Sequence, residues 1–238
     1  MSANVPEGYE PRKSADEQSR AGKARQIIAL IGGQEQLRGR RILEIGCGNG
    51  VITAALAKLT RPDGAVWGVD VVERLITKDG FEFIQVDGTE VPVCSDSMDI
   101  VVSNHVIEHV GSAQDQLAHL REIARVLRRD GFCYLATPNR WWIWEPHFAL
   151  PFLSWLPVAA QHAYVRTAKR AAHYDCRLLG RAELTQMAAN AHLTFEDLTA
   201  EAIRQSLPDS PLTSRVSDWM LRLFARISPT YVMKLRKA

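Results

Sequence analysis

Three glycines at alternate positions, directly after a short apolar strand, constrain this chain more than any other feature. The segment Ile42–Gly50 reads I-L-E-I-G-C-G-N-G, and a helical stretch follows it. Alternating glycines let the backbone turn sharply and leave no side chain between the main chain and a ligand. The N-terminus of the helix adds free N–H groups and a favourable field. The segment therefore predicts a strand–loop–helix unit that binds a nucleotide-like cofactor.

The loop by itself leaves several interpretations open. Dinucleotide enzymes bind a pyrophosphate with G-x-G-x-x-G, but here the third glycine comes one residue early and Val51 stands where that pattern requires glycine. Glu44, two residues before the first glycine, would repel a pyrophosphate and would suit an ammonium group. A glycine-rich turn without any ligand is the simplest alternative. Residues outside the loop are needed to choose between these interpretations.

Strand and helix patterns alternate from residue 41 to residue 137. The expected strands in this part are 41–45, 65–69, 81–86, 99–103 and 132–137, and later strands are expected at 193–199 and 230–236. Helices are expected after a capping box at 14–17, over 51–59, after Ser112, and over 181–191 and about 211–227. This alternation is typical of a parallel sheet with right-handed crossovers.

Two of the expected helices have a recognisable apolar face. The helix that ends at Gly32 and Gly33 places four side chains on one side, Ala21, Ala24, Ile28 and Ile31. The helix that starts at Ser112 places four others on one side, Leu117, Leu120, Ala124 and Leu127. We expect both faces to pack against the sheet.

Polar side chains end four of the expected strands, at Glu44, Asp70, Asp87 and Asn104. In open α/β sheets the carboxyl ends of the strands line the ligand crevice. Asp70 lies 20 residues beyond Gly50, where a carboxylate can accept both hydroxyls of a ribose. A dinucleotide enzyme would share Asp70 but does not predict Glu44 or the signals at Asp87 and Asn104.

The motif E-x-G-x-G-x-G at Glu44–Gly50 resembles motif I of the class I S-adenosylmethionine (SAM)-dependent methyltransferases, and residues 41–138 resemble the core of that family. The resemblance implies SAM as the cofactor. We expect its amino-acid end at Glu44, Gly46, Cys47, Gly48 and Gly50, and its methionine end near Asn104. We expect its ribose at Asp70 and its adenine at Val71 or Val72, Asp87 and Gly88.

The resemblance also implies a fold. It is an α/β doubly wound, seven-stranded, mostly parallel sheet of order 3-2-1-4-5-7-6, with the last strand antiparallel. We expect one domain over residues 1–238, with an N-terminal arm and helix in 1–38. Residues 139–179 are far longer than the usual α/β connection of about 2–6 residues, so we expect a functional insertion after the fifth strand, acting as a substrate lid.

Methyl transfer to oxygen usually needs a base, and three histidines are candidates. His105, Glu108 and His109 are spaced i, i+3, i+4, so a helical turn would gather them just beyond the fourth strand. Neutral histidine is a suitable base for a hydroxyl near pH 7. His147 is the third candidate, two residues from Glu145 in the insertion. Glu108, His109 and the Glu145–His147 turn also have structural interpretations, as backbone or insertion anchors.

A metal at the His105–Glu108–His109 trio is a further possibility. Some quinone O-methyltransferases that this segment resembles use magnesium at a related cluster with two acidic members. Here His105 takes the place of one of them, and magnesium prefers oxygen ligands. We therefore assign no metal.

The insertion carries four tryptophans, Trp141, Trp142, Trp144 and Trp155, and basic residues follow them. It can be an apolar lid, an interfacial surface on anionic lipid, or simply a segment packed on the sheet. Its apolar character predicts a hydrophobic or amphiphilic acceptor, or a lipid-linked sugar. The segments Ser103–Val110 and Thr137–Arg140 resemble the quinone-type and small-molecule subgroup, whose substrates are too varied to name one.

Composition excludes several other classes. The net charge of +2 gives no reason to expect nucleic acid. Four cysteines lie far apart with no C-x-x-C pair, which argues against a zinc knuckle or a disulfide framework and fits a reducing cytoplasm. No signal-peptide pattern is present in the polar first 20 residues. We expect a cytoplasmic protein, with peripheral contact at the inner membrane surface as a further expectation.

The sequence therefore predicts an enzyme that transfers a methyl group from SAM to a small acceptor at a hydroxyl oxygen. N- or C-methylation of a small molecule is the alternative reaction. A non-catalytic SAM-binding partner subunit is the alternative from another class.

Overall fold

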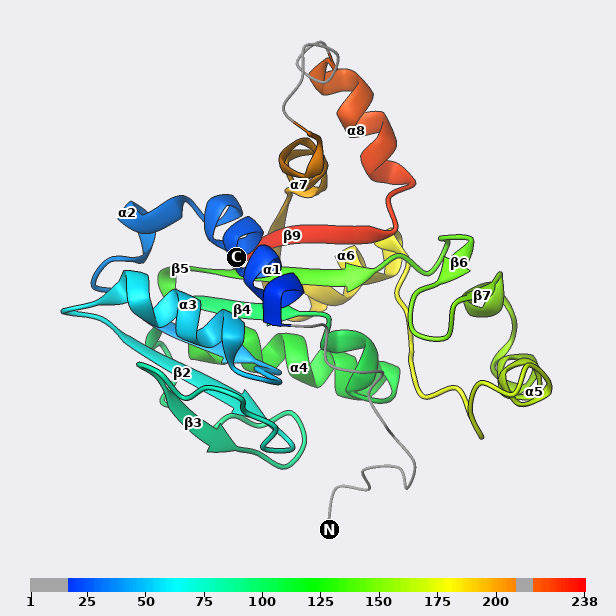
Figure 1. Cartoon of the computed structure of the whole chain (residues 1–238), viewed down its shortest axis with the longest axis horizontal. Helices are drawn as coiled ribbons and strands as arrows, with labels where there is room; N and C mark the ends of the chain where they lie inside the picture. Colours follow the sequence, from blue (N-terminus) through cyan, green and yellow to red (C-terminus); the bar gives the residue numbers. More distant parts are fainter. Residues whose placement is uncertain (1–16, 209–215) are drawn as a thin grey trace.

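Seven strands form one sheet in the order β3-β2-β1-β4-β5-β9-β8 in the computed structural model, which describes residues 17–208 and 216–238 (Figure 1). Strands β1 to β5 are parallel, and β9 pairs antiparallel with both β5 and β8. Two short strands of the insertion are numbered between them, so this is the predicted order 3-2-1-4-5-7-6, and the fold class is confirmed. The strands are β1 (Arg41–Ile45), β2 (Ala65–Asp70), β3 (Glu82–Gln85), β4 (Met98–Asn104), β5 (Leu127–Pro138), β8 (Leu193–Asp197) and β9 (Thr230–Lys237).

Helices cover both faces of the sheet, as a doubly wound fold requires. On one face α1 (Glu17–Leu30), α3 (Val51–Thr60) and α7 (Thr199–Ser206) pack on a core that includes Ile42, Ile100 and Tyr134. On the other face α4 (Ala113–Val126) and α6 (Arg181–Asn190) pack on a core that includes Leu43, Val101 and Leu135. Two more helices are α2 (Gly33–Leu37), and α8 (Asp218–Arg226), which stands beside α7 (Figure 1). None of the described helices has the length and apolar character needed to cross a membrane.

The buried face of α4 differs from the predicted one. Leu120 is buried as expected, but the buried face also carries Gln116 and His119, while Leu117 and Ala124 are only partly buried. Gln116 donates to the carbonyl oxygens of Ile107 and Arg177, both at 2.8 Å, and His119 lies 3.1 Å from the Ser103 hydroxyl. Hydrogen bonds to other segments therefore help to determine which side of α4 faces the core. The pattern of apolar residues in the sequence cannot predict these hydrogen bonds.

Two other elements also differ from the prediction. In α1 the fully buried residues are Ala24 and Ile27, with Ile31 just beyond the helix, whereas the predicted Ile28 is only partly buried. The predicted strand 193–199 ends at residue 197, and α7 follows it without having been foreseen. The capping box at 14–17, the arm and the start of the helix predicted over 211–227 lie outside the described residues, except Glu17, which begins α1.

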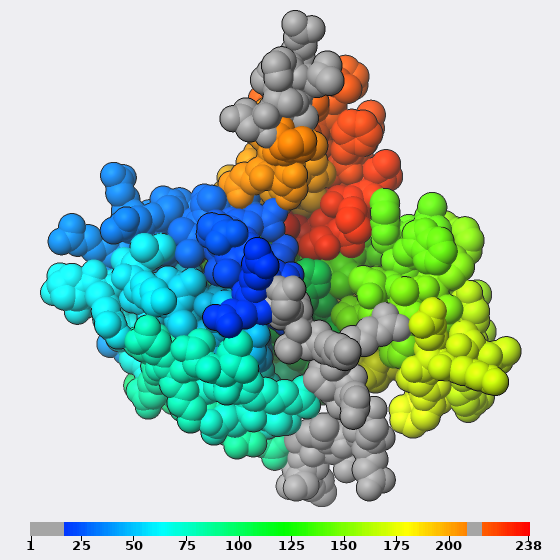
Figure 2. All heavy atoms as spheres, in the orientation of Figure 1, coloured from blue at the N-terminus to red at the C-terminus, as the bar shows by residue number. Residues whose placement is uncertain are grey.

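The insertion forms a lobe beyond the carboxyl ends of β4 and β5 (Figures 1 and 2). It contains the two-stranded β6 (Trp144–Glu145) and β7 (Leu150–Pro151), the short η2 (Leu153–Trp155) and the helix α5 (Val158–Thr167). Its own core contains Leu150, Leu153, Val165, Tyr174, Cys176 and Leu178. A bridge between Asn139 and Leu179 joins its two ends at the sheet. The lobe is thus attached at the edge where the sequence predicts the ligand crevice.

Candidate active site

The three glycines of the loop all adopt the left-handed conformation, with φ of 72° at Gly46, 54° at Gly48 and 80° at Gly50. A Cβ on Gly46 would lie 2.4 Å from Cγ2 of Val106, and one on Gly50 would lie 2.5 Å from the carbonyl oxygen of Thr77. A Cβ on Gly48 would meet no atom within 4 Å. The outer glycines are therefore fixed by close packing, while the middle one faces open space in which a ligand can approach the backbone.

Two carboxylates support this loop. Glu44 is buried below it, where Oε2 accepts a hydrogen bond of 2.5 Å from the hydroxyl of Thr53 on α3. Burial raises the pKa of Glu44 to about 8, against the opposing effects of that hydrogen bond and of the Arg20 charge. Asp70 accepts a hydrogen bond from the backbone N–H of Gly48 at 2.8 Å. Both carboxylates thus have a structural task in addition to their predicted cofactor contacts.

The remaining predicted cofactor residues lie at the carboxyl ends of neighbouring strands. Val71, Asp87 and Gly88 are exposed beyond β2 and β3. Asn104 ends β4 and is buried, and its Oδ1 has no hydrogen-bond partner. Cys47 is buried within the loop. A SAM molecule fits this arrangement, because the unpaired Oδ1 of Asn104 and the open face of Gly48 are the features that its amino-acid end would fill.

His105 follows Asn104 with a left-handed backbone, φ 58°, so its side chain leaves the strand end in a direction that a regular strand would not allow. Its Nδ1 lies 3.3 Å from Oε1 of Glu108, a side chain with no exposed surface. Glu108 belongs to η1 (Ile107–His109), and its Oε2 accepts from the hydroxyl of Thr137 at 3.2 Å. Burial alone would raise the pKa of Glu108, but the close approach and charge of His105, with the charge of His109, lower it. Oε1 of Glu108 has no hydrogen bond in the usual geometry.

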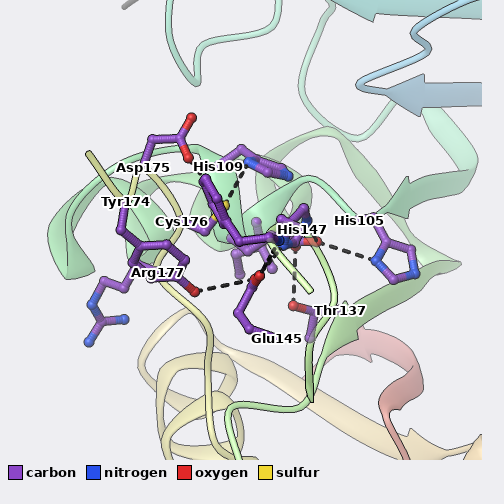
Figure 3. Close-up of polar contacts among 12 residues, drawn as sticks. His105, His109, Thr137, Glu145, His147, Tyr174, Asp175, Cys176 and Arg177 are labelled. Atoms are coloured by element: carbon purple, nitrogen blue, oxygen red, sulfur yellow. Dashed lines mark hydrogen bonds and ion pairs between the residues drawn. The ribbon is translucent and has the colours of Figure 1, made fainter. Parts of the chain in front are cut away.

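The insertion brings His147 to the same cluster (Figure 3). Its Nδ1 lies 2.8 Å from Oε1 of Glu145, and its Nε2 lies 4.0 Å from Oε1 of Glu108. Burial would lower the pKa of His147, but the hydrogen bond and charge of Glu145, together with Glu108, raise it. The His109 ring meets the His147 ring edge-on, with centroids 4.7 Å apart. Burial lowers the pKa of His109 against the opposing charge of Glu108.

The three predicted histidines thus come together, although they come from the β4 end and from the insertion. Sequence reasoning missed three further members of the cluster, Thr137, Tyr174 and Cys176. Cys176 lies with its Sγ 3.6 Å from Nδ1 of His109, and the Tyr174 hydroxyl lies 3.4 Å from Oε1 of Glu145. Tyr174 and Cys176 lie in the last part of the insertion, where the chain returns to the sheet. The sequence shows only that the four cysteines are far apart along the chain. No local pattern would have connected Tyr174 or Cys176 to His109.

Comparison with known proteins agrees with this geometry. Residues 43–135 match a family model described as a methyltransferase domain. A probable SAM-dependent methyltransferase of Mycobacterium tuberculosis is 37% identical over 106 residues, which are 42% of this chain and 36% of the relative. The sheet order and these matches together identify residues 43–135 as the core of a SAM-dependent methyltransferase domain. SAM is therefore its cofactor class, and the matched residues run from β1 to β5.

Other similar proteins extend the likeness beyond the matched core. A ubiquinone biosynthesis O-methyltransferase of Neisseria meningitidis is 26% identical over 182 residues, covering 71% of this chain and 70% of the relative. Magnesium protoporphyrin IX methyltransferase from Synechocystis, solved with bound S-adenosylhomocysteine, superposes with a TM-score of 0.56 at 11% identity over 93% of this chain and 84% of that one. The matched part of the chain covers about a third of the length of the first relative. That relative therefore does not show the activity of the whole protein.

Proposed function

We propose that this protein transfers a methyl group from SAM to a hydroxyl oxygen of a small, hydrophobic or lipid- or sugar-type acceptor, with His105 as the base. The observation that carries the proposal is the pair formed by His105 and the fully buried Glu108, 3.3 Å apart, directly beyond Asn104. SAM, when bound, supplies an electrophilic methyl group on a sulfonium. The likeness to a ubiquinone biosynthesis O-methyltransferase supports oxygen as the acceptor atom.

The residues of this chain divide the work as follows. Gly48, Asp70 and Asn104 hold the donor at the carboxyl ends of β1, β2 and β4. Since Nδ1 of His105 faces Glu108, Nε2 carries the lone pair that can take the hydroxyl proton. The imidazolium that results lies beside a carboxylate whose lowered pKa keeps it ionised. Glu108 therefore acts as a positioning residue that orients the base and stabilises its charged form.

The experiment compares His105→Gln with His192→Gln, because His192 also has a left-handed backbone, φ 56°, and is exposed beyond α6. Each protein is incubated with methyl-labelled SAM and a small-molecule extract of the host, and labelled products are identified by mass spectrometry. We expect His105→Gln to lose about 10²- to 10⁴-fold in turnover while S-adenosylhomocysteine still raises its melting temperature. His192→Gln should retain full turnover.

Several results would contradict the proposal. Full turnover in folded His105→Gln excludes His105 as the base, and full turnover in the variants of His109 and His147 as well would exclude all three candidate histidines. A labelled nitrogen or carbon in the product would favour the alternative reactions. S-Adenosylhomocysteine binding without any labelled product would favour a non-catalytic partner subunit. Stabilisation by NAD instead would contradict SAM binding itself.

The apolar surface of the insertion supports an amphiphilic acceptor delivered from a lipid surface. Trp141, Trp144 and Trp155 are between 42% and 57% exposed, so a large part of each ring faces solvent, while the buried core of the lobe consists of other residues. Basic side chains at Arg166, Lys169 and Arg170 are exposed at the end of α5 and just beyond it. Aromatic and basic residues together favour anionic membrane interfaces.

Helix α8 repeats this pattern with exposed Trp219, Leu223 and Phe224 beside exposed Arg222 and Arg226. We therefore infer peripheral contact with anionic lipid. Co-sedimentation with anionic vesicles at low salt tests it, comparing Trp144→Ser with Phe195→Ser, which removes an exposed aromatic of β8. Loss of binding only in Trp144→Ser supports the lipid surface, and absence of binding by the unmodified protein excludes it.

A further inference from the structure

Three potential metal ligands from separate parts of the chain converge at the junction between the insertion and the core. His109 comes from η1, His147 from the β6–β7 turn and Cys176 from the returning end of the insertion. One ligand atom of each lies within 4.8 Å of the other two, the only such group of three in the described residues. In Figure 3 a dashed line joins His109 and Cys176, and His147 lies between these two and His105.

The distance between two of the ligands already matches a tetrahedral metal site. With metal–nitrogen bonds of about 2.05 Å and a metal–sulfur bond of about 2.3 Å, a tetrahedral ion holds nitrogen and sulfur ligands about 3.6 Å apart. Nδ1 of His109 and Sγ of Cys176 lie 3.6 Å apart. The third ligand needs to approach by at most about 1.4 Å from the 4.8 Å limit to reach the nitrogen–nitrogen separation of about 3.4 Å.

Glu145 already holds one of the three ligands, His147, in position. Glu145 is 1% exposed, and its Oε1 lies 2.8 Å from Nδ1 of His147, which leaves Nε2 as the ligand atom. Its other oxygen accepts from the backbone N–H of Phe148 at 2.6 Å, and the Tyr174 hydroxyl lies 3.4 Å from Oε1. Ligating histidines commonly have such a carboxylate on the second ring nitrogen, where it fixes the tautomer and the ring orientation.

We propose that His109, His147 and Cys176 bind a zinc-type divalent ion that fastens the insertion to the end of β4. Two imidazoles and a thiolate suit zinc and are poor ligands for magnesium. Three protein ligands leave a fourth position for water or an acceptor oxygen. This site adjoins the His105–Glu108 pair, since Nε2 of His147 lies 4.0 Å from Oε1 of Glu108, but it shares no ligand with that pair. The sequence led us to expect no metal, because the cysteine ligand is 67 residues away from His109.

The test uses cobalt(II) as a spectroscopic probe on the full-length protein after treatment with a chelator. Thiolate coordination gives a charge-transfer band in the near ultraviolet, and zinc added afterwards should remove it by competition. We expect the band in the unmodified protein and in Cys94→Ser, which removes an exposed cysteine, and its loss in Cys176→Ser. Glu145→Gln should keep the band and weaken zinc binding about 10- to 100-fold.

A second measurement covers the case in which Cys176→Ser does not fold. Zinc should raise the melting temperature of the unmodified protein and of Cys94→Ser, and His147→Ala should abolish that increase. Absence of the cobalt band from the unmodified protein, or an unchanged band in folded Cys176→Ser, would overturn the proposal. Neither SAM nor an acceptor is present, so the result is independent of the proposed methyl transfer.

Discussion

The buried Glu44 makes the stability of this protein depend on pH in an unusual direction. Its ordinary pKa is 4.5, and burial raises it to about 8 in the folded protein. Between these two pH values the folded state holds a proton that the unfolded state has released. Stability therefore falls as pH rises through this range, because the unfolded state binds fewer protons.

The size of the effect follows from the two pKa values. The difference of about 3.5 units, at 1.36 kcal/mol per unit, corresponds to about 5 kcal/mol of unfolding free energy between pH 4.5 and 8. In Glu44→Gln the side chain stays neutral at every pH, and its amide oxygen can still accept the hydrogen bond from Thr53. The variant should match the unmodified protein near pH 5 and exceed its stability progressively toward pH 8.5.

Urea unfolding at pH 5, 6.5 and 8.5 measures this difference, because all other titrating groups are present in both proteins and cancel. Glu201→Gln, which removes an exposed glutamate of α7, is the matched control and should leave the pH profile parallel to that of the unmodified protein. A parallel profile for Glu44→Gln as well would refute the reasoning, since it would mean that the burial of Glu44 does not change its ionisation.

Three further predictions concern the loop, a cap and the core. Gly46→Ala should destabilise the protein by about 1–3 kcal/mol in urea unfolding, because its Cβ would lie 2.4 Å from Val106, and an unchanged midpoint would contradict this packing. Gly48→Ala has no such clash, so in calorimetry it should lose S-adenosylhomocysteine affinity with a smaller stability cost; full affinity would mean that the open face of the loop is not used. Ser112→Ala removes the capping box of α4 and should cost about 1 kcal/mol, whereas Leu120→Ala removes a fully buried side chain and should cost about 2–5 kcal/mol. Equal losses in these last two variants would contradict the burial pattern of α4.

The sequence determined the sheet of this protein almost completely. The mostly apolar runs 42–45 and 100–103 are buried throughout, so they are visible without knowledge of their neighbours. The glycine loop was equally visible, because positive φ and close backbone approach require glycine at Gly46 and Gly50 whatever the rest of the fold does. Polar strand ends at Asp70 and Asn104 followed from the general property that parallel strands end at one edge.

The tertiary structure alone decided which side chains meet at the candidate site. His105 and Glu108 are close in sequence, so a helical turn could pair them in advance. His109, His147 and Cys176 meet only because the insertion folds back on the end of β4, a contact that spans 67 residues between Cys176 and His109. The same holds for Gln116, whose burial on α4 depends on the carbonyl oxygen of Arg177. Local patterns record which residues are apolar, whereas long-range polar contacts depend on where separate segments end in space.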